Sequence, residues 1–92
     1  MINNAEFNCR VCGMEQEDYP WGLNGRTPSF EICACCGVEF GYGDCTQISV
    51  ARWRENWIEK GASWHDPTDM PTGWSLEDQL RRVPEEFFPT KF

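Results

Sequence analysis

The chain has 92 residues, with 15 acidic and 8 basic side chains and a formal net charge of −7 at pH 7. Its length predicts one domain over residues 1–92, because so short a chain cannot build two independent hydrophobic cores. The acidic balance argues against nucleic acid as a ligand, since DNA- and RNA-binding domains normally carry a basic surface, and it favours a protein partner with a basic surface.

The first residues, Met1 to Phe7, have neither the basic start nor the apolar run of a secretory signal. No later stretch approaches the roughly 18 consecutive apolar residues that a membrane span needs. We therefore expect a cytoplasmic protein without a membrane segment. Thiols stay reduced in the cytoplasm, which favours a metal site over disulfides in a cysteine-rich chain.

Two cysteine pairs form the strongest motif, and each is followed directly by a glycine. Their spacing, C-x2-C-x20-C-x2-C, is typical of a tetrahedral four-thiolate zinc site. The reason is that two residues between ligands let one tight turn direct both sulfur atoms at the same ion. The predicted ligands are Cys9, Cys12, Cys33 and Cys36. A disulfide framework is the alternative for six cysteines in a short chain, but the spacing and the missing signal disfavour it.

Residues 5–43 are predicted to form the metal-binding part. The segments just before the two cysteine pairs are short and rich in β-favouring residues, and residues 39–42 read as a returning strand that Gly41 interrupts. Between the pairs, residues 19–28 are rich in proline and glycine, which indicates an ordered loop.

Residues 44–83 are predicted to be the helical part, beginning with a helix over residues 44–60. Asp44 and Gln47 have the spacing of a capping box, and Gly61 is a favourable stop. Trp53 and Trp57 recur at helical spacing on one apolar face. The simpler interpretation places both rings in the core. The alternative is an exposed ridge for a partner, since tryptophan is a common interface anchor.

A loop over residues 62–73 contains two prolines, and Ser75 then begins a second helix that ends before Pro84. The tail, residues 84–92, is unusually aromatic for a free terminus. It is predicted either to fold back onto the core or to act as a short docking segment.

Three further residues carry reactive side chains. Cys35 falls between two predicted ligands and reads as a packing residue with its thiol turned away, the alternative being a reactive thiol. Cys45 lies just inside the predicted helix start, where the helix dipole would lower the pKa of a thiol, but inert packing is the simpler interpretation. His65 precedes Asp66, and adjacent residues rarely form a productive base and orienting acid, so a surface loop histidine is expected. The sequence therefore predicts no enzyme.

Two segments resemble a known family. Phe7 to Gly13, followed by Ser29 to Glu39, resembles the bacterial cysteine-rich CPCC domain family, and the register from Glu31-Ile32-Cys33 to Glu39 is the most specific part. The likeness covers about residues 7–44. Arg10 and Ala34 stand where that family carries prolines in its knuckles, and its acidic Trp-Glu-Asp-Asp stretch is replaced here. The resemblance implies a small bacterial metal-binding domain and brings no activity with it.

Together these features predict a small α+β fold in which zinc-ribbon-like β knuckles pack against one or two helices. The predicted function is a protein-interaction module stabilised by a structural four-cysteine zinc site, with an inhibitor or immunity-type protein as a sharper version. The alternative is a rubredoxin-like iron electron carrier, because rubredoxins also use two C-x2-C-Gly knuckles and are acidic and aromatic. Against that alternative, Met14 rather than an aromatic residue follows Gly13.

Overall fold

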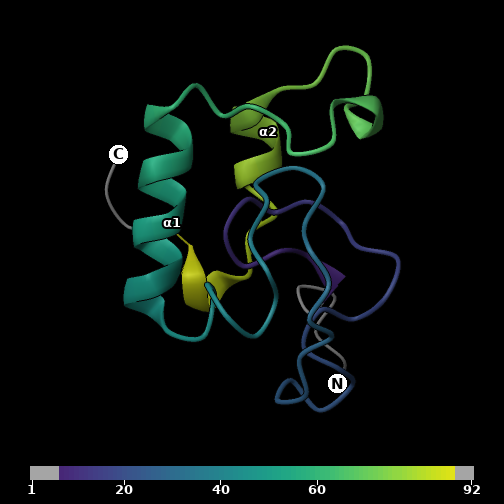
Figure 1. Ribbon diagram of the computed structural model, residues 1–92, viewed down its shortest axis with the longest axis vertical. Coiled ribbons are helices and arrows are strands. Elements are labelled where there is room, and N and C mark those ends of the chain that lie inside the picture. The colour runs from purple at the N-terminus through teal and green to yellow at the C-terminus, as the bar shows by residue number, and fades with distance from the viewer. Residues whose placement is uncertain (1–6, 89–92) are drawn as a thin grey trace.

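Two α-helices and two short 3-10 helices frame a set of ordered loops in the computed structural model, which describes residues 7–88 (Figure 1). In chain order the elements are α1 (Gln47–Glu59), η2 (Pro67–Asp69), α2 (Leu76–Leu80) and η3 (Glu85–Phe87). The first half of the chain, purple to blue in Figure 1, forms loops beside and below the two helices. No helix in the described part of the chain is long and apolar enough to cross a bilayer.

The predicted zinc-ribbon-like α+β fold is wrong, because residues 7–88 contain no β-strand and no sheet. Each expected hairpin is reduced to one antiparallel bridge, Asn8 with Glu15 in the first and Ile32 with Glu39 in the second. The backbone explains why the second bridge does not extend. Phe30 adopts a left-handed φ of 62°, which breaks the extended conformation two residues before Ile32.

Helix α1 begins later than predicted. Thr46 is its N-cap and forms a reciprocal capping box with Ser49, whose hydroxyl accepts from the Thr46 amide at 3.1 Å. The predicted cap, Asp44, is instead fully buried in the preceding loop. Its carboxylate accepts hydrogen bonds from the Trp21 indole at 2.9 Å and the Gly41 amide at 2.8 Å. The Asp44 carboxylate is therefore hydrogen-bonded within the preceding loop, and Thr46 caps the helix instead.

The second half of the chain confirms the helix start at Ser75, whose hydroxyl caps α2. This helix ends at Leu80, earlier than predicted. After the C-cap Arg81, the amides of Arg82 and Val83 bond three residues back to the carbonyls of Gln79 and Leu80, which tightens the chain into a turn. Helix η3 then packs against α1, so the part of the tail that the structure describes does fold back. Residues 89–92 of the predicted tail lie outside the described residues.

The hydrophobic core is built around the cysteines rather than around a sheet. Helix α1 contributes Val50 and Trp57 from one face. Trp64 and Trp74 meet edge to face at 5.5 Å between ring centroids and close the core on the side of the loop after α1. The prediction of two core tryptophans is thus confirmed for Trp57, at 7% exposed, and is wrong for Trp53, which remains 36% exposed.

Candidate metal centre

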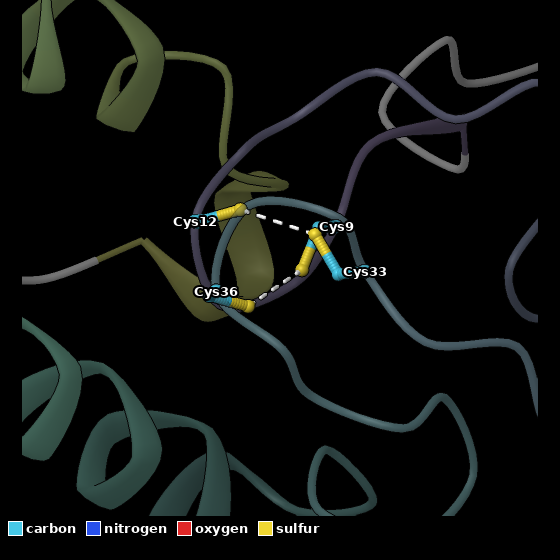
Figure 2. Close-up of side chains that lie close together, drawn as sticks. All are labelled: Cys9, Cys12, Cys33 and Cys36. Carbon is cyan, nitrogen blue, oxygen red and sulfur yellow. Dashed lines mark hydrogen bonds between the residues drawn. The ribbon is translucent and has the colours of Figure 1, made fainter. Parts of the chain in front are cut away.

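Four buried thiols meet at one point between the two loops that carry the cysteine pairs (Figure 2). We call them the cysteine tetrad: Cys9, Cys12, Cys33 and Cys36. Three are fully buried and Cys36 is 6% exposed. Their sulfur atoms all lie within 4.8 Å of one another. The four residues that the spacing selected are therefore the ones that the fold brings together, and the cluster is compatible with a structural metal site.

The two loops share one backbone pattern. In the first knuckle, residues 9–13, the Gly13 amide donates to the Cys9 carbonyl at 2.9 Å. In the second knuckle, residues 33–37, the Gly37 amide donates to the Cys33 carbonyl at the same distance. Both glycines have positive φ, which allows the turn to close directly after its second cysteine. Each knuckle therefore presents its two thiols to the same side.

The tetrad matches the requirements of a four-thiolate ion. A metal–sulfur bond of about 2.3 Å in a regular tetrahedron places the sulfur atoms about 3.8 Å apart. The observed Sγ–Sγ distances are 3.7 Å between Cys9 and Cys36 and 3.6 Å between Cys12 and Cys33. Thiolates are the preferred ligands of zinc and of iron–sulfur proteins. The residues present thus fit a tetrahedral divalent metal ion.

The thiols also interact electrostatically. The hydrogen bond with the Cys12 thiol lowers the pKa of the Cys33 thiol well below its usual range. Burial raises the pKa of Cys12 and Cys36. Burial therefore opposes the thiolate form of Cys12 and of Cys36. A bound cation removes that opposition, because metal coordination deprotonates cysteine outright.

Two polar side chains, which the sequence reasoning missed, attach the helices to the first knuckle. Arg54 of α1 donates to the carbonyls of Arg10 and Val11. Gln79 of α2 donates to the carbonyl of Cys12 at 3.1 Å. Both are about 5% exposed. For Arg54 a sequence signal exists, because it lies four residues after Val50 on the apolar face of the helix. Nothing in the sequence around Gln79 marks it.

A half-buried cation lies on the other side of the first knuckle. The Arg10 guanidinium sits 3.9 Å from the Trp21 ring centroid and 4.5 Å from the Phe87 ring centroid. It also donates to the Asp44 carbonyl at 3.1 Å. Arg10 thus links the first knuckle to the loop before α1 and to η3.

The second knuckle is held by the loop after α1 and by two side chains. The backbone amides of His65 and Asp66 donate to the carbonyls of Cys35 and Ala34 at 3.0 and 2.8 Å. The Trp53 indole donates to the Cys36 carbonyl at 3.0 Å, and the Gln16 amide donates to the Cys33 sulfur at 3.6 Å. Bonds from N–H groups to ligand sulfurs stabilise thiolate character. Trp53 is therefore neither a core residue nor a free ridge, since its indole is bonded to a ligand-bearing loop.

The remaining reactive residues lie outside the tetrad. Cys35 is fully buried, and its sulfur receives a hydrogen bond from Gln79 at 3.2 Å. Cys45 is exposed and precedes the N-cap of α1, so it does not lie inside the helix as predicted. His65 is exposed, and the Asp66 carboxylate accepts from the hydroxyl and amide of Thr68, which lowers the pKa of Asp66.

Comparison with known proteins finds two distant relatives. The chain is similar to the uncharacterized protein YozI of Bacillus subtilis (strain 168), with 27% identity over 81 residues that cover 71% of this chain and 67% of YozI. It is also similar to the uncharacterized protein YoaQ of the same bacterium, with 28% identity over 82 residues that cover 71% of this chain and 68% of YoaQ. No family model and no solved structure matches the chain. The relatives therefore bring no activity to transfer, and membership of the CPCC family stays a prediction.

Proposed function

We propose that this chain is a small protein-interaction module that folds around one structural zinc ion. The observation that carries the proposal is the closed, buried tetrad, which offers four thiol ligands at tetrahedral spacing. Four protein ligands complete a zinc site and leave no position for water or substrate, which distinguishes a structural ion from a catalytic one. The proposed role is therefore to support a surface, without catalysis.

Metal analysis combined with single substitutions tests the metal assignment. Purified protein is expected to be colourless and to contain one zinc per chain, and Cys9→Ser or Cys36→Ser is expected to release the ion and unfold the chain. Apparent binding free energies of roughly 10–16 kcal/mol for structural zinc make the fold depend on the ion. The matched controls Cys35→Ser and Cys45→Ser should keep it. Red protein that contains iron would favour the rubredoxin-like alternative, and release of the ion by Cys35→Ser but not Cys36→Ser would overturn the ligand assignment.

The proposed partner is a protein segment that carries basic and apolar side chains. A hollow of about 360 Å³ lies beside the second knuckle. Its lining includes the acidic residues Glu15, Glu17, Asp18, Glu31 and Asp69 together with the apolar side chains of Met14 and Ile32. We call it the acidic hollow. Ile32 is about half exposed although it is a large aliphatic residue. An apolar contact surrounded by carboxylates complements a basic, partly hydrophobic peptide.

Charge reversal tests the partner. The probe is a synthetic peptide of alternating lysine and leucine, measured by calorimetry at low salt. The double variant Glu15→Lys, Glu31→Lys is expected to weaken binding at least tenfold. The control Glu55→Lys, Glu59→Lys makes the same change in net charge on α1, outside the hollow. Equal weakening by both variants would show that net charge alone attracts the peptide and would overturn the assignment of the hollow.

A further inference from the structure

Arg54 is a buried cation without a carboxylate partner in the described part of the chain. Its side chain projects from the middle of α1 and is 5% exposed. All three of its hydrogen bonds go to backbone carbonyls: Nε to Val11 at 2.7 Å, and Nη2 to Arg10 at 2.9 Å and to Phe87 at 2.8 Å. Across residues 7–88, the ion pair formed is between exposed Arg81 and Asp78, on α2.

A buried charge needs a compensating charge as well as hydrogen bonds. Carbonyl oxygens satisfy the donors of a guanidinium but leave its net charge uncompensated, and a buried uncompensated ion is strongly unfavourable. Within residues 7–88, the groups whose negative charge would act on Arg54 are the thiolate forms of Cys9, Cys12 and Cys36. Burial lowers the pKa of the Arg54 guanidinium, while negative charge on Cys9, Cys12 and Cys36 raises it.

The charge of the tetrad depends on what it binds. Four protonated thiols carry no charge, four thiolates around a ferric ion carry −1, and four thiolates around a divalent ion carry −2. A neighbouring buried cation favours the most negative of these states. Both Arg54 and the tetrad are buried, and charges in a protein interior interact more strongly than in water.

We propose that Arg54 is the counter-ion of the metal centre and the residue that fixes the first knuckle in its metal-binding conformation. The inference rests on the proposed metal site. Nε and Nη2 bind the carbonyls of Val11 and Arg10, the two residues between Cys9 and Cys12. The same guanidinium reaches Phe87, so one side chain joins α1, the first knuckle and η3. A planar fork can hold three carbonyls in fixed directions, whereas a lysine ammonium cannot reproduce that arrangement.

Two substitutions separate the charge from the geometry. Arg54→Lys keeps the charge and loses the fork, and Arg54→Gln loses the charge and keeps one amide donor. Arg52→Gln on the exposed side of the same helix is the matched control. Competition with a chromophoric chelator should show zinc affinity lowered about tenfold by Arg54→Lys and about a hundredfold by Arg54→Gln, the range typical of residues that support metal ligands. The control should bind zinc as the natural chain does.

The iron-loaded protein supplies a measurement that a purely structural role would not change. Reduction of the ferric centre adds one negative charge beside Arg54. Arg54→Gln should therefore shift the reduction potential to a more negative value, while Arg54→Lys should leave it close to that of the natural chain. A potential that is equal in Arg54→Gln and Arg54→Lys would overturn the charge role. Zinc affinities equal to that of the Arg52→Gln control would overturn the inference as a whole.

The cobalt-substituted natural chain keeps this test separate from that of the proposed function. An intense thiolate-to-cobalt absorption typical of four sulfur ligands is expected. Absence of that absorption in the natural chain would refute the metal site itself. Its presence, combined with unaffected Arg54 variants, would refute only the role of Arg54.

Discussion

Gly13→Ala should destabilise the protein more than the same substitution at Gly25, and the difference measures how closely α2 packs on the first knuckle. Both glycines have positive φ, 85° for Gly13 and 72° for Gly25. A Cβ at Gly13 would lie 2.2 Å from the backbone oxygen of Gln79 and 3.0 Å from the amide nitrogen of Val83. A Cβ at Gly25 would meet nothing within 4 Å. The two variants therefore share backbone strain and differ in the clash.

The expected magnitudes follow from those contacts. A left-handed conformation costs about 1–2 kcal/mol for a residue with a Cβ, which is the whole effect expected for Gly25→Ala. At Gly13 the oxygen of Gln79 must retreat by roughly 1 Å to regain an ordinary van der Waals separation. Overpacking of this kind destabilises by about a further 1–3 kcal/mol. Together the two effects should lower the free energy of unfolding of Gly13→Ala by about 2–5 kcal/mol. The displaced residue is also the one whose side chain bonds Cys12 and Cys35.

Thermal melts of the metal-loaded proteins measure the difference. A loss of 1 kcal/mol lowers the Tm of a domain this size by about 4–8 °C. Gly13→Ala is thus expected to melt well below Gly25→Ala, which itself melts below the natural chain. Equal melting temperatures for the two variants would show that α2 moves away from the added methyl group with no loss of stability. That result would refute the close packing on which the predicted difference depends.

The tryptophans of α1 give a second pair of variants. Trp57→Ala should lower the free energy of unfolding by about 3–5 kcal/mol because its ring is buried. Trp53→Ala should lower it by less because its ring is partly exposed. Chemical denaturation curves check this, and a larger loss for Trp53→Ala would contradict the assigned burial. For nucleic acid, gel-shift assays with mixed DNA and RNA at low salt should show no complex, because an acidic surface gains nothing from counterion release. A micromolar complex that weakens steeply with salt would contradict that prediction.

The candidate site could be predicted because its information is local. Two residues between cysteines and a glycine after each pair determine a turn, and the same turn occurs twice. The choice of Cys36 over Cys35 also follows from local register, since Gly37 matches Gly13. The start of α2 at Ser75 and the burial of Val50 and Trp57 on α1 are further short-range features.

The rest of the fold depends on contacts that no local pattern encodes. The second expected hairpin does not extend because Phe30 is left-handed, a conformation that the sequence does not indicate for a phenylalanine. Asp44 has a favourable capping position, yet its carboxylate is taken by Trp21, 23 residues earlier. Gln79 binds Cys12 across 67 residues of sequence. Partners this distant are set by tertiary packing, which overrides local propensity.

If the tetrad holds the proposed ion, the attachment of both helices to the first knuckle would make the folded amount of this protein depend on metal supply. Helix α2 has only five residues, far below the roughly 12–15 that an isolated helix needs to persist in water. Its anchor is the carbonyl of Cys12, one of the four candidate ligands. With the proposed ion absent, the carbonyls that Arg54 and Gln79 bind lose their fixed positions, and the helices lose their support together. Because a ligand that binds only the folded state stabilises it by mass action, the population that survives proteolysis would rise and fall with free zinc. A cell that runs short of the metal would then lose this protein through degradation, without any separate sensor.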